Sequence, residues 1–264
     1  MQPIWNRAQF KQTGKDTFLS NYWPFVGVCV LLALLSGDLF SLQLQQISRE
    51  LVSNSILIYD DPSLGNAVAY GAQLLSPYLA PFVAGSLLLS LLVVFPLQVG
   101  ASRFFLESRP GYKAPFQRIG HGFVENYGNV FLTGLFKWLF TLLWSLLFLI
   151  PGIIRSFGYF AVPYILAENP NLDHSRALQL SLQMTKGYKW DIFVLELSFL
   201  GWFLLSGISF NIAGIFYVNP YYQATLAEAY RFLRENAMAN GYTNSSELPG
   251  TQSPLWSGGT GVGL

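Results

Sequence analysis

Charged residues are scarce in this sequence: Asp, Glu, Lys and Arg together make up 11% of its 264 residues, whereas soluble domains carry roughly 25%. A soluble fold with so little charge could not cover its surface with polar groups. Hydrophobic residues account for 52% of the chain, and they stand in long runs rather than in the alternating or amphipathic patterns of a soluble core. The composition therefore predicts an all-α, polytopic integral membrane protein.

Cysteine, histidine and catalytic motifs are equally sparse. The single cysteine, Cys29, cannot form an intrachain disulfide and leaves no cysteine cluster for a metal. The sequence contains no H-E-x-x-H, no G-x-S-x-G and no phosphate-binding glycine loop. Its formal net charge of +1 gives no basis for nucleic-acid binding. We therefore expect no catalytic site, no metal, no cofactor and no nucleic-acid partner.

Long apolar stretches predict six membrane-spanning helices, because about 20 apolar residues cross the ~30 Å hydrocarbon layer. The first four stretches are 22–40, 73–99, 129–150 and 153–167. The last stretch, 191–229, is divided into a fifth and a sixth helix at Ser206-Gly207. A five-span alternative keeps that stretch as one tilted helix.

The predicted domain organisation is simple. Residues 1–238 form a single transmembrane domain, and residues 239–264, rich in Gly, Ser, Thr, Asn and Pro, form a disordered cytoplasmic tail.

Basic residues predict the orientation in the membrane, because cytoplasmic loops carry an excess of Lys and Arg. With both termini in the cytoplasm, most of the 15 basic residues lie inside. Arg49 and Arg155 then lie outside, and Lys137 lies within the membrane. The five-span alternative would leave Arg231 and Arg234 outside, so six spans agree better with the charge distribution.

The chain shows a weak internal repeat. Asn21-Tyr22-Trp23, Asn126-Tyr127-Gly128 and Gly187-Tyr188-Lys189-Trp190 each precede an odd-numbered span. The segments 116–127 and 177–188, which lead into two of these spans, have amphipathic periodicity and end in aromatic anchors. This pattern predicts three helical hairpins, each preceded by an interfacial amphipathic helix. The alternative explanation is that membrane interfaces favour Tyr and Trp wherever they occur.

A family resemblance begins at the same residues. Ile150-Pro151-Gly152-Ile153-Ile154-Arg155 is followed by Tyr164-Ile165-Leu166-Ala167-Glu168-Asn169-Pro170, by Gly187-Tyr188-Lys189-Trp190 and by Phe199-Leu200-Gly201-Trp202. In this order the motifs resemble the bacterial multi-pass membrane proteins known as domain of unknown function 975. The resemblance implies a bacterial plasma-membrane protein and supplies no activity or catalytic residue. A fainter likeness extends to membrane domains attached to some glycerophosphodiester phosphodiesterases, whose catalytic barrel this sequence lacks.

Two ionisable residues fall within predicted spans, where burying a charge is costly. Lys137 lies in the third span and Glu196 in the fifth. At 1.5 Å per residue both lie roughly 9–12 Å from the cytoplasmic interface. They are candidates for an intramembrane charged pair, which could lock two helices together or take part in transport. The alternative is that each side chain extends separately to the near interface.

The cytoplasmic face offers a second candidate site, a cationic ring that could contact lipid headgroups. Its members are Arg103, Arg109, Lys113, Arg118, Arg176, Lys186 and Lys189. The leading functional hypothesis is therefore a non-enzymatic module that binds membrane lipids or a partner membrane protein. The alternative is a small transporter or channel built around Lys137 and Glu196.

Overall fold

The computed structural model describes residues 4–35, 85, 90–147, 149–209 and 211–250. The chain divides into two compact units. The smaller unit covers Leu31–Val94, and its described part contains the end of one helix and the short π-helix η1 (Ser90–Val94). The larger unit, formed by Met1–Val30 and Phe95–Leu264, carries the features discussed below.

Regular structure in the described residues is helical, apart from one isolated bridge between Arg109 and Tyr112. The predicted all-α class is therefore confirmed. The helices are α1 (Arg7–Ser20), α2 (Tyr22–Leu35), α5 (Phe95–Glu107), η2 (Phe116–Gly120), α6 (His121–Val124), α7 (Tyr127–Leu147), α8 (Leu149–Gly158), α9 (Val162–Glu168), α10 (His174–Met184), α11 (Lys189–Leu197), α12 (Leu200–Ile208), η3 (Gly214–Val218) and α13 (Asn219–Ala239).

The first two helices meet at a sharp bend of 98°. Asn21 lies at the bend, and its side chain is buried. The Asn21 amide donates to the carbonyl of Thr17 at 3.1 Å and to the carbonyl of Arg109 at 3.0 Å. The first bond satisfies a carbonyl that the end of α1 leaves without a helical partner, and the second ties the bend to the segment after α5. The Asn-Tyr-Trp sequence therefore marks a helix boundary here.

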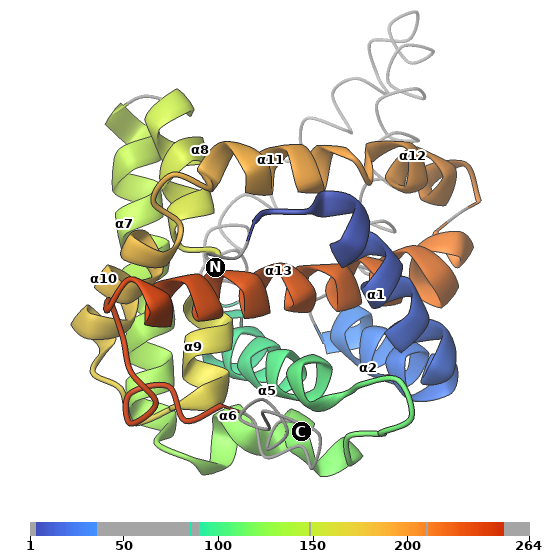
Figure 1. The fold of residues 1–264 in the computed structure, drawn as a ribbon, viewed down its shortest axis with the longest axis horizontal. Helices are drawn as coiled ribbons and strands as arrows, with labels where there is room; N and C mark the ends of the chain where they lie inside the picture. The colour runs from blue at the N-terminus through green and yellow to red at the C-terminus, as the bar shows by residue number, and fades with distance from the viewer. Residues whose placement is uncertain (1–3, 36–84, 86–89, 148, 210, 251–264) are drawn as a thin grey trace, which may run out of the picture. The chain divides into compact units, whose positions relative to one another are not determined.

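Helix α13 forms the centre of the larger unit, between α11–α12 and α5 in Figure 1. It packs against α1 along its length and also contacts α5 and α10. Near one end, the ring of Phe232 lies 5.2 Å from that of Trp5 and 5.3 Å from that of Tyr188, both edge-on. Aromatic pairs at such distances add to the free energy gained by burial, so these contacts attach the residues before α1 and before α11 to α13.

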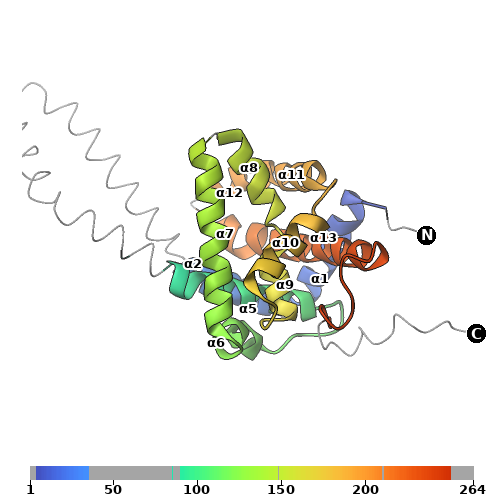
Figure 2. The ribbon, with the colours of Figure 1, turned by 90° about the vertical axis from the view of Figure 1, so that its left-hand side faces the viewer.

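Two helical segments are long and apolar enough to cross a membrane: Tyr127–Leu146, and Lys189–Ile208, which joins α11 and α12. A third is present if the bent pair α1–α2 is one span. Figure 2 shows the first of these as the long helix α7 with α8 beside it, whereas α11 and α12 run in a different direction in Figure 1. The described residues therefore contain two or three candidate spans rather than the predicted six.

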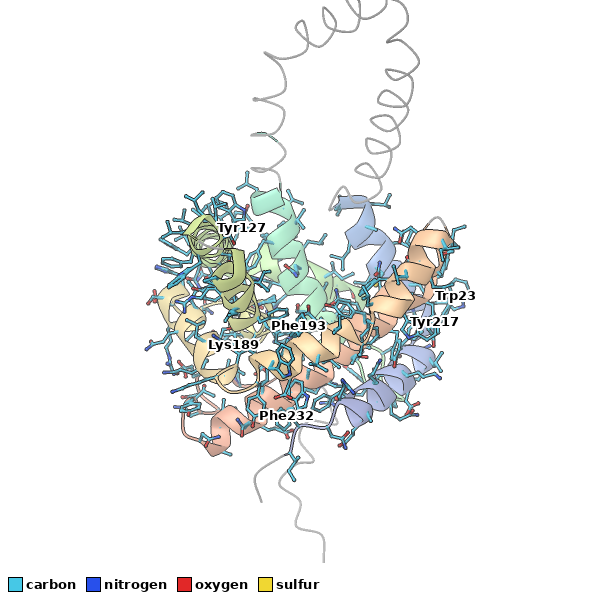
Figure 3. All side chains as sticks on the ribbon, turned by 90° about the horizontal axis from the view of Figure 1, so that it is seen from above. Trp23, Tyr127, Lys189, Phe193, Tyr217 and Phe232 are labelled. Carbon is cyan, nitrogen blue, oxygen red and sulfur yellow. The ribbon has the colours of Figure 1, made fainter. Side chains whose placement is uncertain are left out.

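Large apolar side chains cover the outside of these candidate spans. On α7, Leu143 is 53% exposed and Leu146 81% exposed; on α12, Leu204 is 63% exposed. Figure 3 shows side chains projecting outward from these helices. A continuous exposed apolar surface marks a contact with lipid or with another protein, and it agrees with the low charge content of the sequence.

The predicted fourth and sixth spans have a different form in the structure. Residues 153–167 are divided between α8 and α9, and α9 is too short to span a membrane and is buried along its length. The sixth stretch continues as α13 to Ala239, ten residues beyond the predicted end at Ala229. Its second half is not apolar: it buries charged side chains in the protein interior. Most of the predicted second span, 73–99, lies outside the described residues.

The predicted disordered tail differs from the structure as far as Gly250. After Ala239 the chain turns at Gly241, whose φ of +70° favours glycine. It then returns across α10, where Glu247 forms an ion pair with Arg176 at 2.5 Å, and Leu248 is fully buried. Residues 251–264 lie outside the described residues.

We expect Glu247→Gln to loosen this returning segment at neutral pH. The hydrogen bond from Arg176 lowers the pKa of the Glu247 carboxyl. Its stabilising contribution is thus complete above the ordinary pKa of 4.5 and is lost as the pH falls through the lowered value. The pair is partly exposed, so the loss should stay below about 1 kcal/mol. Limited proteolysis should cleave the segment faster in the variant, whereas exposed Glu235→Gln should behave like the wild type; equal rates in all three proteins would contradict the expectation.

Candidate binding pocket

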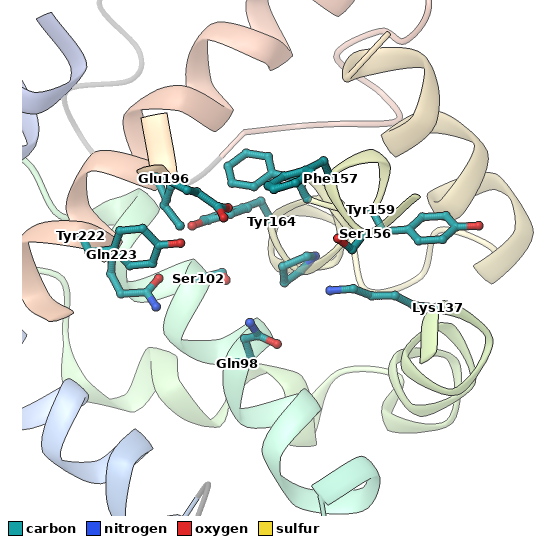
Figure 4. Close-up of a pocket in the computed structure, with 13 residues that line it drawn as sticks. Gln98, Ser102, Lys137, Ser156, Phe157, Tyr159, Tyr164, Glu196, Tyr222 and Gln223 are labelled. Carbon is teal, nitrogen blue, oxygen red and sulfur yellow. The ribbon is translucent and has the colours of Figure 1, made fainter. Parts of the chain in front are cut away.

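A pocket of about 330 Å³ lies among the helices of the larger unit. Its walls come from α5, α7, α8, α9, α11 and α13, so it draws on most of the chain after Val94 (Figure 4). The lining residues are Gln98, Ser102, Lys137, Ser156, Phe157, Tyr159, Phe160, Pro163, Tyr164, Glu196, Tyr222, Gln223 and Leu226. Polar side chains predominate, although several of the contributing helices are strongly apolar.

Lys137 and Glu196 line this pocket from different helices, α7 and α11. Figure 4 shows them on opposite sides of the space, with the Lys137 ammonium pointing into it. None of the ion pairs formed between described residues joins the two side chains. The sequence predicts both side chains at a similar depth in the membrane, and the structure places both at one pocket without a direct contact.

Each charge has its own surroundings. The Lys137 ammonium lies 5.7 Å from the centroid of the Phe95 ring, within the range of a cation–π interaction. The Tyr222 hydroxyl lies on the same side of the pocket as the Glu196 carboxylate and interacts with it (Figure 4). Neither interaction neutralises the charge, so each group can still attract a ligand group of opposite charge.

Sequence reasoning missed the neutral polar residues of the pocket. Gln98 and Ser102 come from α5, and Tyr164 and Tyr222 come from α9 and α13. Tyr164 is buried and stacks on Tyr230 with 4.9 Å between ring centroids. An available signal was the amide of Gln98 inside a long apolar run, because an amide in hydrocarbon needs a polar partner.

Two members of the predicted cationic ring, Arg103 and Arg118, form ion pairs within the protein. Arg103 lies in α5, not in a loop, and its side chain is buried. It pairs with Glu107 at 2.6 Å and donates to the carbonyl of Ala167 at 2.6 Å. Arg118 pairs with the same carboxylate at 2.8 Å. Arg103 therefore cannot contact a lipid headgroup, because its donors face the protein interior.

The other members of the ring differ in exposure. Arg176 pairs with Glu247, and burial lowers the pKa of Arg109 to about 10, helped by nearby Arg231. Lys113 and Lys186 are exposed, and Lys189 is half-buried. The structure thus does not gather the seven residues into one cationic surface. The amphipathic segments are α10, and η2 with α6.

A second group of buried charges lies where α9 meets α13. Glu168 accepts a hydrogen bond from the Arg234 guanidinium at 2.9 Å and one from the Tyr230 hydroxyl at 3.0 Å. The backbone N–H of Gly250 donates to the same carboxylate at 2.9 Å. Buried charges are tolerated when they are paired and hydrogen-bonded in this way. This group supports the helices that carry Tyr164 and Tyr222.

No group of three or more potential metal ligands occurs within the part of the chain that the structure describes. These observations define the class: an all-helical protein with apolar candidate membrane spans and a charged pocket between its helices.

The chain belongs to the family described as Protein of unknown function (DUF975), which matches residues 86–237. The resemblance seen in the sequence is therefore confirmed. No curated protein and no solved structure matches the chain.

Proposed function

We propose that the chain is a non-enzymatic membrane module that binds a polar lipid, with the headgroup in the pocket between Lys137 and Glu196. The observation that carries the proposal is a polar pocket with two unpaired charges among helices that are apolar outside. Burying such charges is costly, and a bound headgroup would offset that cost. Pockets that bind small ligands begin at roughly 300 Å³, so this one suits a headgroup rather than a whole lipid.

The proposal includes a topology. The three predicted hairpins, with both termini in the cytoplasm of a bacterial cell, put the lipid-binding pocket in the plasma membrane. The support is the distribution of Lys and Arg and the presence of two or three candidate spans in the described residues. Protease added to sealed inside-out vesicles should cleave after Gly250, and protection of this region would contradict the orientation.

Lipid retention tests the function directly. The protein extracted gently from its own membrane should carry a stoichiometric lipid in native mass spectrometry. A lost charged hydrogen bond costs about 1.5–3 kcal/mol, which is about tenfold to hundredfold in affinity. Lys137→Gln should therefore lose most of the retained lipid, whereas Lys15→Gln, an exposed control outside the pocket, should keep it. Equal retention in both variants would overturn the proposal.

Transport is the second candidate, because opposite charges on two candidate spans, α7 and α11, face one polar space. Intramembrane ionisable groups often mark the path of a substrate or an ion. Uptake of a solute into sealed vesicles, lost in both Lys137→Gln and Glu196→Gln, would favour transport over lipid binding. A stoichiometric protein partner in the same extraction would instead favour the partner-binding hypothesis.

A further inference from the structure

We infer that the pocket recognises a zwitterion, with its ammonium group facing Glu196 and its anionic group facing Lys137. This inference rests on the proposed function and specifies the chemical class of the ligand. A phospholipid headgroup that combines an ammonium with a phosphate has this chemistry, and so does the free headgroup compound in solution.

The separation of the two charges is the first reason. Lys137 and Glu196 face each other across the pocket (Figure 4) and form no ion pair with each other or with another described residue. A purely anionic ligand would be attracted by Lys137 and repelled by Glu196, whereas a simple cation would meet the reverse. Only a ligand that carries both a positive and a negative charge is attracted by Glu196 and by Lys137 at the same time.

The uncharged residues that line the pocket also differ between the Glu196 side and the Lys137 side. Tyr222 and Tyr164 lie on the Glu196 side of the pocket, and Phe157 lies beside them (Figure 4). Aromatic rings stabilise an ammonium by cation–π attraction in addition to the carboxylate. On the other side of the pocket lie Lys137 and Ser156 (Figure 4). The Ser156 hydroxyl donates to the carbonyl of Ile153 at 2.7 Å, so the Lys137 ammonium is the group that would bind an anionic oxygen. The pocket therefore has an end suited to a cation and an end suited to an anion.

The rim of the pocket favours a lipid over a free solute. Ser156 and Gln98 are exposed, so the pocket is open on that side. Ile153 lies one turn before Ser156 on the same face of α8, and it is 47% exposed. An acyl chain attached to a headgroup in the pocket would lie against this side chain and bury it from the surroundings.

The test compares lipids that differ in the sign of the headgroup. Delipidated full-length protein is placed in nanodiscs or detergent with equal amounts of phosphatidylethanolamine, which is zwitterionic, and phosphatidylglycerol, which is anionic. Native mass spectrometry then measures the bound fraction of each. We expect at least about tenfold preference for phosphatidylethanolamine. Preference for phosphatidylglycerol would overturn the inference while leaving lipid binding intact, whereas retention of neither lipid would overturn the proposed function itself.

Variants assign the two ends. Glu196→Gln should reduce phosphatidylethanolamine binding and leave phosphatidylglycerol binding equal or stronger, whereas Lys137→Gln should reduce both. Tyr222→Phe, which keeps the ring and removes the hydroxyl, should weaken phosphatidylethanolamine less than Glu196→Gln does. Exposed Glu125→Gln serves as the control with wild-type binding. If Glu196→Gln changes the binding of the two lipids equally, Glu196 does not bind the ammonium group. If Glu196→Gln folds poorly, Tyr222→Phe is used in its place, provided that its thermal unfolding matches that of the wild type.

Free phosphoethanolamine distinguishes the two sources. If it displaces phosphatidylethanolamine at millimolar concentration, the headgroup alone supplies the recognition and a soluble zwitterion is the ligand. If it fails to displace the lipid, the apolar rim contributes and a membrane lipid is the ligand. Both results support a zwitterion site, and displacement by glycerol phosphate instead of phosphoethanolamine would overturn it.

Discussion

Glu168→Gln is expected to lower the free energy of unfolding by about 3–5 kcal/mol. The carboxylate is buried, with a side chain 2% exposed, and it pairs with Arg234, whose side chain is 6% exposed. Removing the negative charge replaces a charged pair with the buried Arg234 guanidinium by a weaker neutral contact. The amide oxygen of Gln can still accept a hydrogen bond, but a neutral oxygen compensates a buried cation poorly.

The measurement is unfolding of the detergent-solubilised protein by heat or denaturant, followed by tryptophan fluorescence. A matched control is Glu247→Gln, because Glu247 also pairs with an arginine but the Arg176 side chain is 32% exposed. That variant should lose less than about 1 kcal/mol. Combining Glu168→Gln with Arg234→Met should recover part of the loss, since the buried cation is removed together with the carboxylate that pairs with it. A loss equal to that of Glu247→Gln would show that the interior around Glu168 is hydrated.

Helix positions were predicted well where hydropathy alone decides them. The third apolar stretch, 129–150, corresponds to α7 at Tyr127–Leu147. The apolar residues of α7 face outward, so the local hydropathy pattern is sufficient to predict where the helix begins and ends. The similar depths of Lys137 and Glu196 follow from rise per residue alone and stay a prediction, whereas the structure adds that both residues line one pocket.

Helices that continue beyond their apolar residues were predicted badly. The second apolar stretch ends at Val99, but α5 continues to Glu107. Arg103 can lie in this buried part of the helix because it pairs with Glu107 and donates to a carbonyl of α9. Helix α13 likewise continues past Ala229, since Arg234 pairs with Glu168, 66 residues earlier in the chain. Such pairs join segments that are distant in sequence, and a positive-inside count cannot distinguish a buried arginine from an exposed one.

The pocket shows the same limit. Its polar lining combines single residues from helices separated by long apolar stretches, such as Gln98 on α5 and Tyr222 on α13. Each residue alone is unremarkable in the sequence. Only the packing of α5, α9 and α13 brings them together, and that packing depends on close backbone contacts that no periodicity encodes.

Gly100→Ala tests one such close backbone contact of α5, the contact with η2. A Cβ added at Gly100 in α5 would lie 1.8 Å from the carbonyl oxygen of Ile119 in η2. A second crossing lies close by, since a Cβ at Gly122 would lie 2.1 Å from the carbonyl oxygen of Pro96. Both obstacles are backbone atoms, which cannot rotate away as a side chain does. The two segments would have to separate, and we expect a loss of about 3 kcal/mol or more, at or above the upper end for overpacked sites.

The control is Gly201→Ala in α12, where an added Cβ meets nothing within 4 Å. Alanine is favoured over glycine inside a helix by about 0.5–1 kcal/mol, so this variant should be equally stable or slightly more stable. The comparison holds the chemical change constant and varies only the space around it. Because α5 also supplies Gln98 and Ser102 to the pocket, Gly100→Ala should weaken lipid retention as well, whereas Gly201→Ala should not. A Gly100→Ala protein as stable as Gly201→Ala would mean that α5 and η2 do not approach as closely as their backbones indicate.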